Sequence, residues 1–213
     1  MDTIDDTLRA YYAKCFEEHG ATPLGVDWHN WQSLALHYDK MLAVLEPVAD
    51  GAPAPSVLDV GCGFGGLLDH AEARGVALDY TGIDIVPAMI DHGRARHANA
   101  RFEAASIFEF EPARRFDYVV CNGVLTEKLD ASIMDFDAFA RRIIRRMFEL
   151  AERGIAFNMM TSHVNFTAPN LFYKNPLEVI AFCTAELSTK FRLDHAYRHF
   201  DYTMYVYRDP QAD

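Results

Sequence analysis

The apolar and polar positions of this 213-residue chain alternate in short blocks from about residue 56 onward. Apolar runs rich in β-branched residues predict buried strands. Stretches with apolar residues three or four positions apart predict the helices between them. The predicted strands are Val57–Val60, Tyr80–Ile85, Arg101–Ile107, Phe116–Asn122 and Gly154–Met160, and the predicted helices are Leu67–Arg74, one beginning at Pro87, and Ile133–Ala151. This alternation is typical of a parallel, doubly wound sheet.

The pattern changes near the C-terminal end. Asn175 as a cap and Pro176 at the first position predict a helix over Leu177–Leu187. Arg192–Arg198 and Asp201–Arg208 then alternate polar and apolar residues, which predicts an antiparallel pair of strands. The predicted fold is therefore an α/β, Rossmann-like sheet of seven strands with an antiparallel C-terminal pair.

Residues 1–50 carry a helical pattern with no strand signal. Apolar residues recur from Leu8 to Cys15, a loop is predicted over Thr22–Trp28, and a second helix over Asn30–Ala49. The segment 51–55, with two prolines, leads into the first strand. We expect one domain over residues 1–213, with 1–50 as a helical cap or lid over an α/β core of 56–213.

A glycine-rich turn follows the first predicted strand. Gly61, Gly63, Gly65 and Gly66 allow a tight turn and a close approach of the backbone to a ligand before the next helix begins. Asp84, at the end of the second strand, is placed to bind both hydroxyls of a ribose. This spacing also fits a dinucleotide-binding site, so an NAD-linked oxidoreductase and a non-catalytic nucleotide-binding regulatory module remain alternatives.

Asp59, two residues before Gly61, extends the motif to Asp-x-Gly-x-Gly-x-Gly, which resembles the first motif of the class I S-adenosylmethionine-dependent methyltransferases. The antiparallel C-terminal pair is also typical of that family and unlike a dinucleotide dehydrogenase. The resemblance implies S-adenosylmethionine (SAM) as the cofactor and S-adenosylhomocysteine (SAH) as the product.

The resemblance also implies roles for individual residues. Asp59, Gly61 and Gly63 would border the methionine moiety, and Asp84 the ribose. Ser106 and Ile107 would contact the adenine, although many relatives carry an acid at the position of Ser106. Asn122 and Gly123 would border the amino acid end. The remaining residues expected at the cofactor are Cys62, Ile85, Met89 and Val124, together with Trp28 and Gln32 of the lid.

The composition restricts the class of methyl acceptor and the cellular compartment that we expect. Twenty Lys and Arg against 31 Asp and Glu give a net charge of −11, which disfavours nucleic acid. The four cysteines show no metal-ligand spacing, and we expect no metal. No signal peptide and no apolar run of membrane-spanning length appear, so we expect a cytoplasmic protein without a membrane partner. The sequence does not predict an oligomeric state.

The acceptor is expected to be a small molecule with an oxygen or nitrogen nucleophile, methylated by in-line displacement. His163 follows the fifth predicted strand and so opens at the same edge as the glycine turn, which makes it a candidate base, with Glu127 as the alternative. Tyr11, Tyr12 and Tyr173 are candidates for lining the acceptor pocket.

Overall fold

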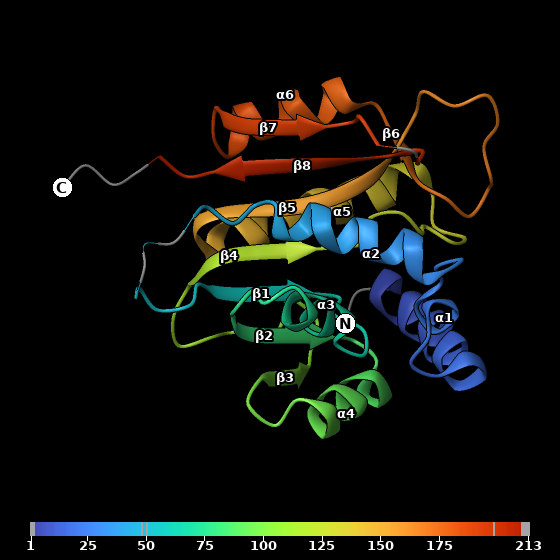
Figure 1. Cartoon of the computed structure of the whole chain (residues 1–213). Coiled ribbons are helices and arrows are strands. Elements are labelled where there is room, and N and C mark those ends of the chain that lie inside the picture. The colour runs from blue at the N-terminus through green and yellow to red at the C-terminus, as the bar shows by residue number, and fades with distance from the viewer. Residues whose placement is uncertain (1–2, 48, 50, 198, 210–213) are drawn as a thin grey trace.

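The computed structural model describes residues 3–47, 49, 51–197 and 199–209, and its centre is one mixed sheet (Figure 1). The strands are β1 (Ser56–Val60), β2 (Asp79–Asp84), β3 (Arg101–Ala104), β4 (Phe116–Cys121), β5 (Ala151–Thr161), β6 (Tyr173–Lys174), β7 (Lys190–Asp194) and β8 (Asp201–Tyr207). Their order is β3-β2-β1-β4-β5-β8-β7, and the short β6 pairs with β5. β8 runs antiparallel to both β5 and β7, whereas β1 to β5 pair in parallel. The predicted fold class is confirmed, with β6 as an eighth strand.

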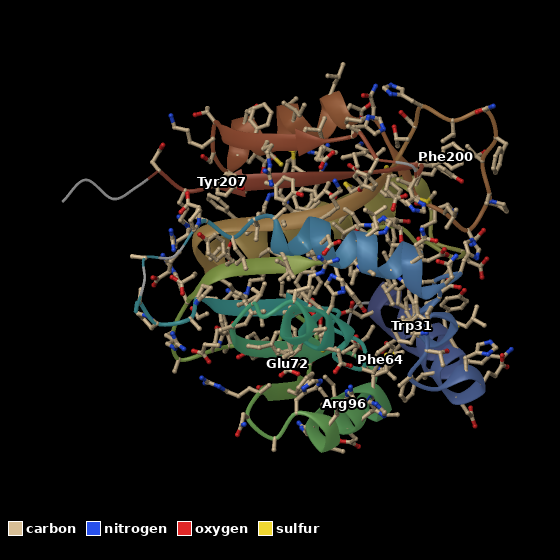
Figure 2. All side chains as sticks on the ribbon, viewed as in Figure 1. Trp31, Phe64, Glu72, Arg96, Phe200 and Tyr207 are labelled. Carbon is tan, nitrogen blue, oxygen red and sulfur yellow. The ribbon has the colours of Figure 1, made fainter. Side chains whose placement is uncertain are left out.

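Helices cover both faces of the sheet because the strand side chains alternate between two cores (Figures 1 and 2). The helices are α1 (Thr3–His19), α2 (Trp31–Leu42), α3 (Gly66–Ala73), α4 (Pro87–Arg96), α5 (Ile133–Leu150) and α6 (Pro176–Glu186), and η1 (Pro23–Val26) is a 3₁₀ turn. Leu58 and Val60 of β1 pack in the core that contains α5 and α6. Val57 packs on the other face with α2 and α3.

The second helix is shorter than the sequence predicted. α2 ends at Leu42, not at Ala49, and two turn residues follow it. Pro47 prevents the helix from running through to Ala49, because a proline lacks the N–H that a helix interior requires and disfavours helical backbone in the residue before it. Val48, which the prediction included, lies outside the described residues.

The seventh strand was predicted too late in the chain. β7 spans Lys190–Asp194 and pairs Lys190 with Tyr207, whereas the sequence predicted Arg192–Arg198. The Asp194 carboxylate accepts a hydrogen bond from the Ala196 N–H at 3.1 Å, and such a side chain to backbone bond favours a turn over continued pairing. Arg198 lies outside the described residues.

Two further properties follow from the fold. All four cysteines are free thiols, and Cys62, Cys121 and Cys183 are buried. Among the described residues, no helix combines the length and the apolar character needed to cross a membrane.

A buried polar network connects α2 with the centre of the sheet. The fully buried ring of His37 lies 2.8 Å from the Ser33 carbonyl oxygen through Nδ1 and 2.7 Å from Asp201 Oδ2 through Nε2. Both ring nitrogens therefore lie within hydrogen-bond distance of an acceptor oxygen. Asn158 Nδ2 lies 3.5 Å from the same oxygen of Asp201, and Asn158 Oδ1 accepts the N–H of Gly123 at 2.7 Å.

Removing the carboxylate of this network is expected to destabilise the fold strongly. Asp201→Ala leaves His37 buried without its partner, and breaking a buried pair in this way costs about 3–5 kcal/mol. The free energy of unfolding from urea titration measures the effect. Lys14→Gln is the control, since it breaks an exposed i,i+4 pair with Glu18 and should change the same quantity by ~0.5 kcal/mol or less. A loss below ~1 kcal/mol in Asp201→Ala would contradict a structural role for the pair.

Candidate functional site

The glycine turn after β1 needs glycine for steric reasons. Gly61 has φ +71°, and a Cβ atom there would lie 2.2 Å from Cγ2 of Val124. The N–H groups of Gly61 and Cys62 both donate to the Ile83 carbonyl, at 2.9 and 3.0 Å. The turn is therefore held against the end of β2, and no larger residue at position 61 preserves its path.

Asp84, at the end of β2, fixes the same turn from its side chain. Its Oδ2 accepts the N–H of Gly63 at 2.9 Å, and its Oδ1 accepts the N–H of Val86 at 2.8 Å. Burial raises the pKa of Asp84, while these backbone hydrogen bonds oppose the shift. A carboxylate has about four acceptor positions, so the two oxygens retain capacity for the hydroxyls of a ligand.

Asp59, in β1, is a buried acid that lines a cavity together with the glycine turn and Asp84. It is 3% exposed, and Oδ2 accepts a hydrogen bond from the Tyr80 hydroxyl at 2.7 Å. Burial raises the pKa of Asp59 to about 7; the Tyr80 hydrogen bond opposes this shift, and the charge of Asp84 adds to it. The group therefore changes charge near neutral pH, and a cationic ligand would favour its ionised form.

The loop after β4 carries a buried acceptor without a partner. Oδ1 of Asn122 is buried and accepts no hydrogen bond from the described residues. An unsatisfied buried oxygen costs free energy unless a ligand supplies the donor. A donor group such as an ammonium fits this position, and Asp59 lines the same cavity.

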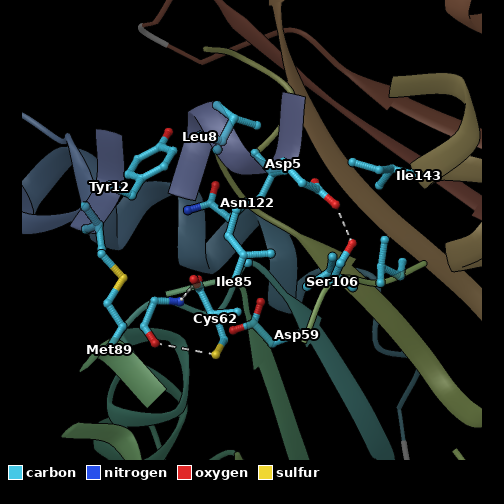
Figure 3. Close-up of a pocket in the computed structure, with 18 of the residues that line it drawn as sticks. Asp5, Leu8, Tyr12, Asp59, Cys62, Ile85, Met89, Ser106, Asn122 and Ile143 are labelled. Atoms are coloured by element: carbon cyan, nitrogen blue, oxygen red, sulfur yellow. Dashed lines mark hydrogen bonds between the residues drawn. The ribbon is translucent and has the colours of Figure 1, made fainter. Parts of the chain in front are cut away.

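These groups line one cavity at the carboxyl edge of the parallel strands (Figure 3). The residues predicted for the cofactor that line it are Trp28, Asp59, Gly61, Cys62, Gly63, Asp84, Ile85, Met89, Ser106, Ile107, Asn122, Gly123 and Val124. Gln32 is exposed on α2 and does not line it. We call this space the cofactor cavity, after the prediction from the sequence that its residues bind the cofactor. Leu8, Tyr12 and Val26 close it from the N-terminal segment.

Ser106 is placed differently from the strand residue that the sequence predicted. β3 ends at Ala104, because the carbonyl of Ser106 accepts the N–H groups of Glu109 and Phe110 and so begins a turn. The Ser106 hydroxyl donates to Asp5 Oδ2 of α1 at 2.6 Å. Asp5 was missed at the sequence level, since nothing in the local pattern around residue 5 indicates a partner 101 positions away.

A second cavity adjoins the first, and we call it the neighbouring cavity. Tyr12, Val26, Trp28 and Gly123 line both. The neighbouring cavity also contains two predicted residues, Tyr11 and Glu127, and the lining residues that the sequence analysis missed include Asp27, Asn170 and His199. The Tyr11 hydroxyl donates to Asp27 Oδ2 at 2.8 Å.

Glu127 is a titratable group of the neighbouring cavity whose pKa is raised by burial. It is 8% exposed, and its Oε2 accepts from Asn170 Nδ2 at 3.0 Å. Burial raises the pKa of Glu127 to about 7, the Asn170 hydrogen bond opposes the shift, and the charge of Asp27 adds to it. A carboxylate with this pKa is suited to accept a proton near neutral pH.

The other two acceptor-side predictions lie elsewhere in the structure. His163 is exposed in the loop after β5, its ring centroid is 6.1 Å from that of His195, and it lines neither cavity. The Tyr173 side chain accepts a hydrogen bond from the Ala168 N–H at 3.1 Å, and Tyr173 lines neither cavity.

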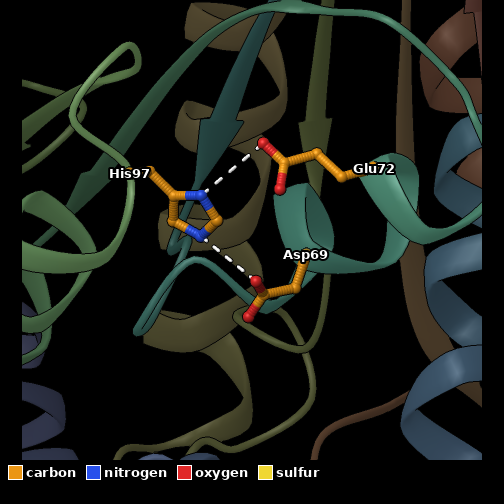
Figure 4. A group of neighbouring side chains, drawn as sticks. All are labelled: Asp69, Glu72 and His97. Carbon is orange, nitrogen blue, oxygen red and sulfur yellow. Dashed lines mark ion pairs between the residues drawn. The ribbon is translucent and has the colours of Figure 1, made fainter.

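Three possible metal ligands meet on the outside of α3 and at the end of α4 (Figure 4). His97 Nε2 lies 3.3 Å from Asp69 Oδ1, and its Nδ1 lies 3.7 Å from Glu72 Oε1. The carboxylates approach opposite nitrogens of one ring, and Arg96 also pairs with Asp69 at 2.7 Å. The cluster thus joins one histidine, two carboxylates and one arginine, and none of these residues lines the cofactor cavity.

A parallel sheet with a glycine turn, an acid at the end of β2 and a cavity at the carboxyl edge defines a Rossmann-like nucleotide-binding protein. Comparison with known proteins assigns the family. Residues 57–154 match a family model described as a methyltransferase domain. A Mycobacterium tuberculosis protein, Rv1506c, whose name describes it as a methyltransferase, is 31% identical over 165 residues, covering 75% of this chain and 96% of that protein.

Solved structures agree with this assignment at the level of the fold. Magnesium protoporphyrin IX methyltransferase from Synechocystis PCC 6803 with bound SAM has a TM-score of 0.68 at 17% identity, covering 98% of this chain and 99% of that one. The DhpI-SAM-HEP complex has a TM-score of 0.63 at 20% identity, covering 97% and 99%. The chain belongs to the class I SAM-dependent methyltransferases; SAM is its cofactor and SAH its product. The oxidoreductase and regulatory-module alternatives are thereby set aside.

The buried acid of β1 should make cofactor binding depend on pH. With a pKa of about 7 in the free protein, Asp59 is mainly protonated at pH 5.5 and ionises as the pH rises. An SAH ammonium group beside Asp59 would favour the ionised form, so the affinity for SAH should then rise by up to ~10-fold per pH unit towards pH 7 and level off above it. Calorimetry measures this.

Two variants separate the groups that titrate near pH 7. Asp59→Asn should flatten the pH dependence of SAH affinity, because the amide does not ionise. Glu127→Gln should retain it, because Glu127 lines the neighbouring cavity and not the cofactor cavity. A wild-type affinity that is constant from pH 5.5 to 7 would exclude Asp59 as the titrating contact.

Proposed function

We propose that this methyltransferase transfers the methyl group to an oxygen or nitrogen nucleophile of a small molecule that binds in the neighbouring cavity. The observation that supports this most is that the two cavities share Tyr12, Val26, Trp28 and Gly123 as a common wall. An acceptor in one cavity thus lies beside the cofactor in the other. Positioning of this kind alone accounts for effective molarities of ~10⁵ M or more.

We further propose how the chain holds SAM, which supplies an activated methyl group when bound. Asp84 accepts hydrogen bonds from the ribose hydroxyls, and Asp59 and Asn122 Oδ1 receive the ammonium group of the amino acid end. Ile85, Met89 and Ile107 provide apolar surface for the base. The orphaned oxygen of Asn122 and the buried carboxylates support this orientation.

Charge favours a small acceptor that is neutral or cationic. The described lining of the neighbouring cavity contains Asp27, Glu127 and Asp201 but no Lys or Arg. With a net charge of −11 for the whole chain, a phosphate backbone would be repelled, so we propose no nucleic-acid substrate. The solved relative of Synechocystis is named for magnesium protoporphyrin IX, also a small molecule. The free thiols support our proposal of a cytoplasmic location.

Of the two candidate bases, we propose Glu127 before His163. Glu127 lies in the neighbouring cavity, and the pKa of about 7 lets it remove a proton from an alcohol, phenol or ammonium at neutral pH. His163 remains an alternative only if the loop that carries it moves towards the acceptor. Tyr11 and Tyr12 would line the acceptor, whereas Tyr173 would support that loop through Ala168.

The test is SAH formation from SAM with pools of small alcohols, phenols and amines, followed by variants on the acceptor found. Glu127→Gln should lower turnover by ~10²-fold and leave SAH affinity within about twofold. Wild-type turnover should rise from pH 6 to 8 as Glu127 ionises. His163→Ala is the matched comparison and should retain turnover within about threefold. The reverse ranking would assign the base to His163, and SAH formation only with RNA or DNA would refute a small-molecule acceptor.

We also propose that the segment Thr22–Gln32 acts as a lid within the cap of residues 1–50, as part of one domain spanning residues 1–213. This segment supplies Val26 and Trp28 to the wall between the cavities. Trp28 packs against Gly123 and lies 4.3 Å from the His37 ring, between centroids. A loop can open and close over a site, whereas the sheet beneath it cannot.

Hydrogen exchange tests the lid. Backbone amides of Thr22–Gln32 should exchange more slowly when SAH is bound, because closure reduces local opening. β7 is the internal control, since it lies at the far edge of the sheet and should exchange at the same rate in both states. Equal exchange of the Thr22–Gln32 amides with and without SAH would refute the lid.

A further inference from the structure

A buried hydrogen-bonded pair closes one end of the cofactor cavity. Asp5 is 5% exposed, Ser106 is 3% exposed, and the Ser106 hydroxyl donates to Asp5 Oδ2 at 2.6 Å. Both side chains line the cavity (Figure 3). Asp5 comes from the first turn of α1 and Ser106 from the loop after β3. The helical cap of residues 1–50 therefore contributes a carboxylate to the end of the cavity beside β3.

Sheet order determines which part of the cofactor meets this pair. From β4 through β1 and β2 to β3, the cavity presents Asn122, then Asp59, then Asp84, and finally Ser106 with Asp5. If Asp84 holds the ribose and the amino acid end lies towards β4, the base extends towards β3. Ile85 and Ile107 line this end and provide apolar surface, so its polar groups are the Ser106 hydroxyl and the Asp5 carboxylate.

The pair presents acceptors to the base. A carboxylate accepts hydrogen bonds and does not donate them, and the Ser106 hydroxyl binds one of the two Asp5 oxygens, Oδ2. The Ser106 hydroxyl uses its hydrogen on Asp5 and therefore also offers only acceptor capacity. The exocyclic amino group of adenine donates hydrogen bonds and matches this surface, whereas a carbonyl oxygen in its place would face an anion.

We propose that Asp5 is a base-specificity residue: its carboxylate, oriented by Ser106, accepts the adenine amino group and rejects a 6-oxo purine at that place. The proposal rests on the orientation of SAM given above. It also gives α1 a direct role in cofactor recognition, in addition to its packing on the core through Leu8.

The experiment compares SAH with its deaminated analogue, S-inosylhomocysteine, by calorimetry on the whole chain. Wild type should bind SAH at least ~10-fold more tightly, as expected for one hydrogen bond to a charged group. In Asp5→Asn the amide both donates and accepts, so the ratio of the two dissociation constants should fall to within about threefold.

Asp6→Asn is the matched control, because it removes the same charge from the same turn of α1 at an exposed position. Its ratio should equal that of wild type, whereas Ser106→Ala should lower the ratio by removing the hydrogen bond that orients Asp5 Oδ2. If Asp5→Asn does not fold, Ser106→Ala decides the question. An unchanged ratio in the folded variants, or tight SAH binding by wild type with no discrimination, overturns the role of Asp5 and leaves the proposed methyl transfer intact.

Discussion

The two hydrogen bonds from backbone N–H groups to Asp84 are the constraint on which the cofactor cavity depends. They tie the glycine turn, through Gly63, to the beginning of α4, through Val86, and so fix two loops from adjacent parallel strands at one side chain. The geometry requires glycine at position 61, because Val124 occupies the space of a Cβ atom there. The same carboxylate therefore shapes the site and remains available to a ligand, which explains why the turn and the acid occur together in the sequence.

A second set of buried polar contacts connects α2, in the helical cap of residues 1–50, with the loop after β4. His37 of α2 binds Asp201 of β8, Asn158 of β5 lies next to the same carboxylate, and Asn158 holds the N–H of Gly123. Trp28 packs on that glycine from the other side. The wall between the two cavities is thus supported by a network inside the core, and a change in α2 would alter the position of that wall.

Local signals in the sequence predicted the fold and most of the residues that line the cofactor cavity. The strand, glycine turn and acid from Asp59 to Asp84 lie within one βα unit, so periodicity and composition locate them. Contacts between distant segments had no such signal. The Ser106 and Asp5 pair depends on the docking of α1, and the burial of Glu127 depends on Asn170 and the cap. His163 shows a related limit: its place after β5 indicated the edge of the sheet, but the sequence did not show that the side chain lies outside both cavities.

The burial of Glu127 is consistent with the charge changes of the proposed reaction. A permanently ionised carboxylate beside the cavity wall would stabilise the positive charge of the bound reactant cofactor, and that charge disperses as the methyl group leaves. Stabilising the ground state more than the transition state slows a reaction. Raising the pKa to about 7 reduces this effect, because the group is neutral part of the time and still accepts a proton at physiological pH. Under the proposed function, the shared wall at Trp28 separates a cavity whose carboxylates bind the cofactor from one in which the carboxyl group of Glu127, with its raised pKa, acts on the acceptor.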